Sequence, residues 1–488
     1  MKLHKQTRVS SIKLFFFIFV IRTINSLSIQ TFFQADEFYQ SLEPAHYFTY
    51  GYGYLTWEWE YKLRSSIQPL IYVFGYTLAG ENKTLIYYIP KLINALVASL
   101  FDFSLYGFIL NYSKSYNLAW TGLILSIFNA FNWFVLTRSF SNNLEACFTT
   151  LALKYWPWNK RIGKSWYICL IFITLSCIIR PTNAIFWLPF GFWLLYLVPI
   201  GFKFVLSSIA EVVLVLIANL GADYYFYREI TFPYFNFIEF NYIKNLASFY
   251  GVAPWHFYIS QALPLMLLTY IPIFLCGLEK SILLVTCIIY IVGFSTIKHK
   301  EFRFLMPLSP IFLYFAARGY KKWKWKYLSI IGIFINVVVA LFLSNINERG
   351  AIDVVNYLGN KNADSVFFMT PCHSFPWQSS FHNKEIQIES LTCLPPLDIS
   401  NPSIEELKNY RDESDVFYDD IDQGILNIMN QQNLPTYIVI FQGLENLMDQ
   451  QDKYYQKEKR FFNSYFHWDD RRKGDVILYK KINNKTSK

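Results

Sequence analysis

The sequence predicts a polytopic α-helical membrane protein with about eleven transmembrane helices and a small α+β C-terminal domain. Three observations support this fold class. Of the 488 residues, 53% are apolar and only 16% are charged, against about 25% charged residues in soluble domains. Residues 1–345 consist of apolar segments separated by small basic clusters, whereas residues 346–488 alternate short apolar runs with polar stretches. A disordered chain is excluded, because disorder requires low hydrophobicity.

The apolar segments approach the roughly 20 residues that a helix needs to cross a bilayer. The first segment follows a basic N-terminus and has no clear cleavage site after it, so we interpret it as an uncleaved helix with a cytoplasmic N-terminus. The predicted spans are residues 12–27, 86–110, 118–137, 144–157, 166–180, 182–199, 203–222, 261–278, 282–297, 304–319 and 327–345.

Lysine and arginine support this orientation. Eleven crossings place fifteen of them in the N-terminal segment and the short cytoplasmic loops, but only five in the short loops of the far side. Basic residues of short loops are what orient membrane helices. The net charge of +9 is therefore explained without nucleic-acid binding, which we do not expect.

The predicted domains are a transmembrane domain, 1–345, and a far-side C-terminal domain, 346–488. Two far-side segments of the first domain, 28–85 and 223–260, are too long to be simple connections and mix aromatic residues with charges. Such composition suits helices that lie in the membrane interface. The C-terminal domain contains two cysteines, Cys372 and Cys393, which can form a disulfide if the domain faces an oxidising lumen.

Adjacent carboxylates, Asp36 and Glu37, follow the first span. In a loop both can point into one cleft, and a positioned carboxylate can act as a general base. The structural alternative is an acidic pair at the start of a helix, where the helix dipole stabilises negative charge.

A second far-side cluster combines aromatic residues with charges: Glu43, Trp57, Glu58, Trp59 and Arg64. Aromatic rings can pack on the C–H faces of a sugar while carboxylates bind its hydroxyl groups. The alternative is an aromatic belt at the membrane interface. Composition supports the two interpretations equally.

The third far-side cluster consists of cations at the ends of spans: Arg138, Arg180, His299, Lys300 and Arg303. Arginine and lysine bind phosphate oxygens and stabilise the charge of a departing phosphate, so this cluster suits a lipid-linked phosphate. The alternative is that the side chains extend to lipid headgroups. No phosphate loop, nucleophile elbow or metal-ligand spacing occurs, and His373 and His382 are interpreted as structural.

The ordered set of motifs resembles the dolichol-phosphate-mannose-dependent mannosyltransferases of glycosyltransferase family 22, which have the GT-C fold. The shared pieces are the Asp36-Glu37 loop with Glu43, the Arg138–Glu145 motif, Arg180-Pro181-Thr182 and the His299–Phe304 motif. The resemblance implies an inverting enzyme of the endoplasmic reticulum lumen that uses dolichyl phosphate mannose and has no obligatory cofactor or metal.

Within that family the likeness is to the members that add the third, α-1,2-linked mannose to the glycosylphosphatidylinositol (GPI) precursor. It rests on three passages, 52–65, 370–382 and 391–397. The resemblance implies that Asp36 is the base, that Glu37 helps to place the acceptor, and that the cations lie near the donor phosphate. With this family the predicted acceptor-binding residues are Glu43, Trp57, Glu58, Trp59 and Arg64. The expected partners are the lipid-linked donor, the GPI glycolipid acceptor and membrane lipids.

Three other interpretations stay open at this point. A sister enzyme of the family would share the mechanism and differ in its acceptor. A transporter would instead place charges at mid-membrane and use broken helices, and a non-catalytic scaffold would not need the acidic loop. Asn82 and Asn484 are predicted glycosylation sites, because both lie in sequons on the predicted luminal side.

Overall fold

The computed structural model describes residues 10–199, 201–244, 246–361, 363–397, 399 and 402–482. The chain forms two compact units, which we treat separately. The membrane unit consists of the segment that ends at Ser28 together with Pro90–Tyr234 and Ala253–Ala340. The sheet unit consists of Ile29–Ile89, Phe235–Val252 and the chain from Leu341 onward.

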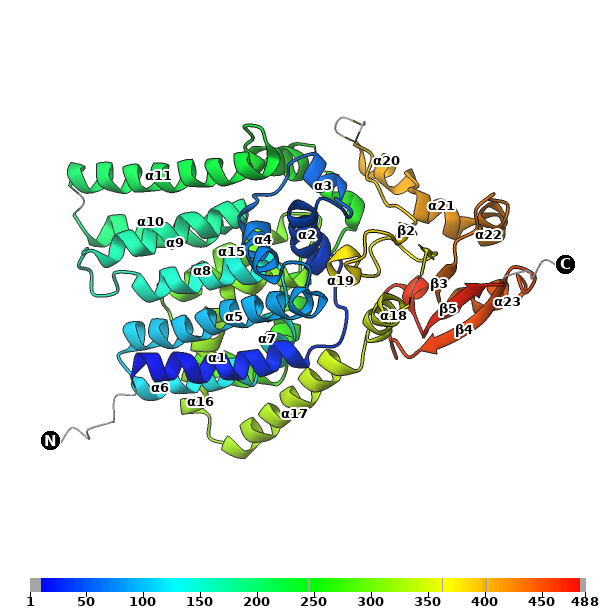
Figure 1. Cartoon of the computed structure of the whole chain (residues 1–488). Helices are drawn as coiled ribbons and strands as arrows, with labels where there is room; N and C mark the ends of the chain where they lie inside the picture. The colour runs from blue at the N-terminus through cyan, green and yellow to red at the C-terminus, as the bar shows by residue number, and fades with distance from the viewer. Residues whose placement is uncertain are drawn as a thin grey trace. The chain divides into compact units, whose positions relative to one another are not determined.

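The membrane unit is a bundle of helices (Figure 1). Apolar side chains cover most of each helix, as expected for elements that face either lipid or other helices. Its α-helices are α1 (Ser11–Ser28), most of α5 (Lys83–Ser113), α6 (Tyr116–Ile127), α7 (Ala130–Val135), α8 (Ser141–Tyr155), α9 (Ser165–Ile179), α10 (Ala184–Leu197), α11 (Phe202–Tyr227), α13 (Leu263–Leu267), α14 (Ile271–Gly277), α15 (Ile282–Ser295), α16 (Ser309–Lys322) and most of α17 (Lys326–Asn345).

Each predicted span coincides with a helix or with consecutive helical pieces. Among the described residues, five helical segments are long and apolar enough to cross a membrane: Ser11–Ser28, Lys83–Ser113, Phe202–Tyr227, Tyr258–Gly277 and Lys326–Gly359. Four further apolar helices are shorter, including Ser165–Ile179 and Ile282–Ser295. The multi-pass helical class is thus confirmed, while the count of eleven crossings stays a prediction.

A buried ion pair joins two of these membrane helices. Arg22 of α1 donates from Nε to Asp102 Oδ2 of α5 at 2.7 Å, and both side chains are fully buried. Ser126 donates to the other carboxylate oxygen at 2.6 Å, and Arg22 also donates to Asn25 at 3.0 Å. A charge inside a membrane bundle is tolerated when it is paired in this way. Asp102 therefore locks α5 against α1.

The sheet unit combines short helices of the first predicted luminal segment with the C-terminal chain. Its helices are α2 (Glu43–Tyr50), α3 (Trp57–Glu60), α4 (Ile67–Ala79), α12 (Pro233–Ile238), α18 (Gly350–Gly359), α19 (Gln378–Phe381), α20 (Ile404–Asn409), α21 (Glu413–Asp419), α22 (Ile421–Met429) and α23 (Glu445–Asp449), α12 bordering the membrane unit. Segment 28–85 contains helices, as predicted, while their location in the membrane interface stays a prediction.

Five strands form one mixed sheet in the order β2-β1-β3-β5-β4 (Figure 1). The strands are β1 (Ser365–Phe368), β2 (Gln387–Ser390), β3 (Tyr437–Phe441), β4 (Tyr455–Phe461) and β5 (Val476–Lys481). β1 pairs in parallel with β2 and β3, whereas β5 pairs antiparallel with β3 and β4. The central β3 reads Tyr-Ile-Val-Ile-Phe and is buried throughout, as a strand covered on both faces should be.

The two compact units do not follow the predicted domain boundary. Segments 29–89 and 235–252, which the sequence analysis assigned to the first domain, belong to the same unit as the C-terminal sheet. The physical reason is a set of contacts distant in sequence. Trp57, Phe240, Leu246 and Leu407 share one buried apolar cluster, and hydropathy along the chain carries no information on such pairings.

Candidate active site

Two arginines of the membrane unit bring three sequence motifs together. The Arg180 guanidinium, at the end of α9, lies 4.9 Å from the centre of the Phe304 ring. The Arg303 guanidinium lies 5.3 Å from the centre of the Phe140 ring, which precedes α8. Each arginine therefore stacks on an aromatic ring from another motif, an arrangement that favours guanidinium over ammonium groups.

Each of these arginines also faces a carboxylate, which is buried in Glu145 and partly exposed in Glu301. Arg303 donates to Glu301 from Nε and Nη2, both at 2.7 Å. Arg180 Nε lies 3.7 Å from Glu145 Oε2, and the other oxygen of Glu145 accepts from Asn183 at 2.8 Å. Burial opposes ionisation of Glu301, but Arg303 and His299 outweigh it and hold the pKa of this carboxyl well below its usual range. The carboxylates fix the orientation of the arginines.

The remaining predicted cations belong to the same motifs. His299 Nε2 lies 3.3 Å from Glu301 Oε1. Lys300 donates from Nζ to the carbonyl oxygens of Ala253, at 3.0 Å, and Ile297, and burial lowers the pKa of its ammonium group. Arg138 donates to the backbone carbonyl of Phe134 at 2.8 Å, and its guanidinium lies over the Phe134 ring.

The motifs contain four basic side chains and two carboxylates, so they carry an excess of positive charge even with His299 neutral. The cations are Arg138, Arg180, Lys300 and Arg303, and the carboxylates are Glu145 and Glu301. All of these side chains are buried except that of Glu301, which is 18% exposed. A preorganised cationic site of this kind can stabilise charge on a phosphate leaving group.

The acidic pair of the sequence lies in the sheet unit, where a short helical stretch begins. Asp36 is half-buried and Glu37 is buried. The Tyr39 ring follows within the same turn and lies 4.5 Å from the His373 ring, centre to centre. Burial lowers the pKa of His373 to about 4, and the negative charge of Asp36 opposes that shift. Asp36 therefore shares its surroundings with a neutral histidine.

Glu43, predicted to bind an acceptor, is tied to its own chain instead. Its carboxylate accepts hydrogen bonds from the backbone N–H of Trp377 at 2.8 Å and of Ser379 at 3.2 Å, and from the Ser379 hydroxyl at 2.6 Å. Burial raises the pKa of this carboxyl to about 7 despite those hydrogen bonds. The geometry gives Glu43 the role of holding passage 370–382, so it lends no support to acceptor binding.

The predicted acceptor aromatics are also packed within the unit. Trp57 is 6% exposed in the apolar cluster with Leu246, and Trp59 is 3% exposed and donates to the Tyr39 carbonyl at 2.9 Å. Glu58 and Arg64 pair through two hydrogen bonds of 3.1 and 2.7 Å and keep 19% exposure each. Of the five predicted acceptor residues, Glu58 and Arg64 are the ones that retain access to solvent.

A buried histidine pair connects α2 with passage 370–382. His46 Nε2 lies 3.0 Å from His382 Nδ1, and the Tyr52 hydroxyl lies 3.1 Å from the same nitrogen. His382 Nε2 in turn lies 2.9 Å from Glu81. Burial and the neighbouring His382 lower the pKa of His46 to about 4. These contacts support a structural reading of His382.

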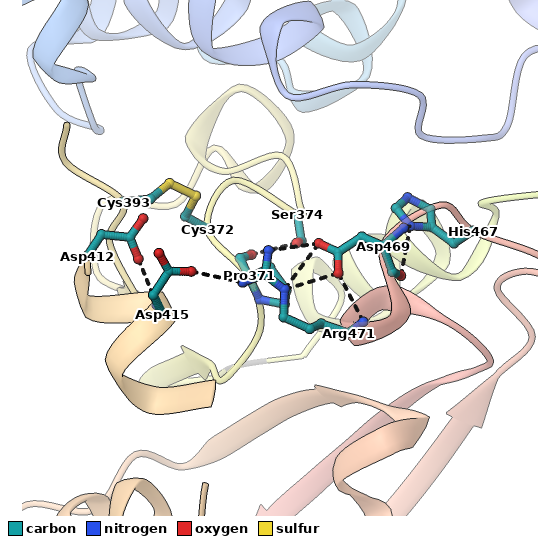
Figure 2. Close-up of polar contacts among 9 residues, drawn as sticks. All are labelled: Pro371, Cys372, Ser374, Cys393, Asp412, Asp415, His467, Asp469 and Arg471. Carbon is teal, nitrogen blue, oxygen red and sulfur yellow. Dashed lines mark hydrogen bonds and ion pairs between the residues drawn. A yellow bond between two sulfur atoms is a disulfide. The ribbon is translucent and has the colours of Figure 1, made fainter. Parts of the chain in front are cut away.

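The disulfide between Cys372 and Cys393 joins two of the passages singled out in the sequence (Figure 2). The nitrogen of His373 and the two sulfur atoms lie within 4.8 Å of one another, a grouping that could bind a metal only with free thiolates. In the disulfide form, His373 is the remaining ligand. Asn82 is exposed and caps α5 through its side-chain oxygen. Asn484 lies outside the described residues.

Comparison with known proteins identifies the group to which the chain is related. The profile of the Alg9-like mannosyltransferase family matches residues 13–382. The chain belongs to this family. The match extends from the first membrane helix through His382, so it includes the acidic pair, the predicted cations and the histidine pair.

Curated relatives cover nearly the whole of this Alg9-like mannosyltransferase. It is 56% identical over 480 residues to a Candida albicans protein named GPI mannosyltransferase 3, covering 97% of this chain and 99% of that protein. The Yarrowia lipolytica protein of the same name is 38% identical, covering 95% and 96%. A Xenopus laevis protein named GPI alpha-1,2-mannosyltransferase 3 is 33% identical, covering 87% and 82%.

A solved structure supports the fold. ArnT from Cupriavidus metallidurans, crystallised with undecaprenyl phosphate, matches with a TM-score of 0.59 over 96% of this chain and 97% of that chain, at 11% identity. At this identity the likeness concerns the fold alone, which is GT-C. The predicted GT-C fold and the prediction of a glycosyltransferase are confirmed.

Three neighbours of predicted site residues were not singled out from the sequence: Glu145 and Glu301 in the membrane unit, and His373 in the sheet unit. The two glutamates stand inside the quoted motifs, and their proximity to arginines in the chain could have suggested ion pairs. His373 was assigned a structural role, because nothing local links it to Asp36, 337 positions earlier.

Proposed function

We propose that the chain transfers the third mannose, in α-1,2 linkage, from dolichyl phosphate mannose to the two-mannose GPI precursor in the endoplasmic reticulum lumen. The observation that carries this proposal is 56% identity over 97% of the chain to the protein named GPI mannosyltransferase 3. The linkage follows the name of the Xenopus laevis relative, GPI alpha-1,2-mannosyltransferase 3.

In this proposal the cations of the membrane unit bind the donor phosphate. Arg138, Arg180, Lys300 and Arg303 supply positive charge, and His299 can donate a further hydrogen bond. As the bond between mannose C1 and the phosphate oxygen breaks, negative charge develops on the departing dolichyl phosphate. Fixed cations stabilise that charge without reorganising, and this is the source of their catalytic effect.

Asp36 is the proposed base. Its carboxylate takes the proton of the 2-hydroxyl of the second mannose while that oxygen forms the new bond to C1. The single displacement converts the β-linked donor into an α-linked product and releases dolichyl phosphate. Glu37 helps to position the acceptor, and the partly exposed Glu58 and Arg64 are the proposed contacts to its more distant groups.

No metal or other cofactor is required by this scheme. Dolichyl phosphate already leaves as a phosphate, and protein cations take the place that a metal ion has in nucleotide-sugar enzymes. We therefore expect the purified enzyme to keep its activity after treatment with EDTA. Loss of activity that added Mn²⁺ or Mg²⁺ restores would contradict the scheme.

The decisive experiment determines which lipid intermediates accumulate after depletion of the protein. Cells are labelled with inositol, and the mannose number of the GPI and dolichol-linked intermediates is determined. A two-mannose GPI intermediate, cleared by the wild type but not by Asp36→Asn, is the expected result. The Asn variant should lose about 10²-fold or more in rate.

Other outcomes of the same experiment contradict particular parts of the proposal. A three-mannose GPI intermediate would assign the protein to the next mannose. A truncated dolichol-linked oligosaccharide with normal GPI would assign it to N-glycan assembly. Full activity of a folded Asp36→Asn protein would leave the acceptor assignment standing and remove Asp36 as the base.

A further inference from the structure

A loop of the sheet unit, residues 462–468, exposes large aromatic side chains that no part of the proposed reaction uses. We name it the aromatic loop. Trp468 is 88% exposed, Tyr465 72% and Phe466 60%. Contiguous exposed apolar surface is rare on soluble proteins and marks a site of interaction with a partner or a membrane.

The aromatic loop is held firmly to the chain that follows α17. The backbone carbonyl of Asn463 accepts from the N–H of Glu348 at 2.8 Å, and its side chain accepts from the N–H of Ala351 at 3.3 Å. Asn347 in turn accepts from the N–H of Tyr465 at 3.3 Å. Asn463 is fully buried. The exposed rings are thus presented from a fixed backbone.

The same loop stacks on the last turn of a membrane helix. The Tyr465 and Phe466 rings lie 6.1 and 6.4 Å from the Phe342 ring of α17, centre to centre, and both are stacked at 22°. Leu341 and Ile346, at the same helix end, are 49% and 42% exposed. α17 begins a segment, Lys326–Gly359, that is long and apolar enough to span the bilayer, and we infer that the C-terminal end of α17 meets the boundary between hydrocarbon and headgroups.

The charges beside the aromatic loop are largely neutralised within the protein. Arg471 donates to Asp469 at 2.9 Å and to Asp415 at 3.3 Å (Figure 2). Lys473 pairs with Asp470. Burial and the positive charge of Arg472 lower the pKa of His467 to about 4, so this histidine is neutral near pH 7. Arg472 lies 3.9 Å from Glu348, so each described cation of residues 469–473 has an acidic neighbour and leaves little unpaired charge to attract anionic lipid.

We propose that the aromatic loop inserts Tyr465, Phe466 and Trp468 into the headgroup region of the bilayer at the C-terminal end of α17. Tyrosine and tryptophan concentrate at this depth, because they combine an apolar ring with a polar edge. The contact depends on the rings and is insensitive to salt. It fixes the sheet unit at a defined depth, independently of which sugar the enzyme transfers.

The test uses the full-length protein in nanodiscs of neutral phosphatidylcholine. An environment-sensitive fluorophore is attached at Trp468→Cys, in a background with the exposed thiol removed by Cys276→Ser. Leu426→Cys on α22, 48% exposed in the same unit, is the matched control. We expect a blue-shifted emission at position 468 that is quenched by spin-labelled headgroups and unchanged by high salt, and neither effect at position 426.

Two results would overturn the proposal. An emission at position 468 as red as at position 426 would place the loop in water. A blue shift without quenching by lipid spin labels would mean that a protein surface, such as a second copy, covers the rings. If Trp468→Cys fails to fold, Tyr465→Cys provides the same readout from the neighbouring ring.

Discussion

The Ser379 hydroxyl donates a 2.6 Å hydrogen bond to the Glu43 carboxylate, 336 positions earlier in the chain. The same carboxylate accepts from the backbone N–H groups of Trp377 and Ser379. One buried acid thereby satisfies three donors of passage 370–382. The passage carries His373, which lies beside Tyr39 in the stretch that begins with Asp36, so Glu43 controls the surroundings of the proposed base from a distance.

Removing the Glu43 carboxylate should therefore destabilise the sheet unit. Glu43→Ala leaves three buried donors without an acceptor, at about 1–3 kcal/mol for each such group, whereas Glu43→Gln keeps one acceptor oxygen and should cost less. We expect the thermal midpoint to be highest in the wild type, lower in Glu43→Gln and lowest in Glu43→Ala. Equal midpoints for Ala and wild type would show that the hydrogen bonds contribute nothing. Asp353→Ala, at an exposed ion pair of the same unit, is the matched control.

Glu43 also predicts a pH dependence of stability. Because burial raises its pKa from 4.5 to about 7, the folded state keeps a proton that the unfolded state releases. This contribution is fully present below pH 4.5 and is lost as the pH rises through 7; it amounts to about 3 kcal/mol for a shift of this size. Thermal midpoints measured across that window should fall less steeply in Glu43→Gln than in the wild type. Parallel slopes would contradict the assignment.

The disulfide between Cys372 and Cys393 should stabilise the fold by lowering the conformational entropy of the unfolded chain. Closing a loop over a separation of 21 residues is worth about 3 kcal/mol. Replacing both cysteines by serine should lower the thermal midpoint and, because His373 is adjacent, also the rate of transfer. Cys276→Ser, at an unpaired thiol, should change neither. A double variant with wild-type stability and rate would show that the bond is dispensable.

Much of the membrane fold was predictable from sequence, because hydropathy is a local property. The predicted spans 12–27 and 203–222 fall on α1 (Ser11–Ser28) and α11 (Phe202–Tyr227). The sites of positive charge at span ends were also visible, since arginine inside or beside an apolar segment is exceptional. The three cationic motifs, predicted at one membrane face, do share contacts within the membrane unit.

The environment of each side chain was not predictable in this way. Trp57 and Trp59 alternate with Glu58 and Glu60, a pattern equally compatible with a sugar-binding surface and with a packed core. The structure buries Trp57 because Phe240 and Leu407, from distant parts of the chain, pack in the same cluster. Trp59 is also buried and donates to the Tyr39 carbonyl. Glu43 is the polar counterpart: its donors lie 334 and 336 positions away, and no local pattern could reveal them.

The ion pair between Arg22 and Asp102 should be essential for assembly of the membrane unit. Asp102→Asn leaves a fully buried arginine without a counter-charge, which typically costs about 3–5 kcal/mol. We expect a sharply lower thermal midpoint in detergent. Replacing both residues by leucine removes the charges together and should recover most of the loss. A double variant no more stable than Asp102→Asn would show that the hydrogen bonds to Asn25 and Ser126 matter more than the charge.

Arg180 and Arg303 should act on the donor rather than on the acceptor. If they bind the donor phosphate, Arg180→Gln and Arg303→Gln should each lower kcat by about 10²-fold and raise the KM for dolichyl phosphate mannose, with little change in the KM for the acceptor. The control is Arg318→Gln, because Arg318 also pairs with a carboxylate of the membrane unit, the partly exposed Glu279 at 2.6 Å, but lies outside the three motifs. Equal losses in all three variants would mean that arginine supports the bundle only. Losses confined to the acceptor KM would move the cations to the other substrate, because a charge that stabilises the leaving phosphate must act on donor turnover.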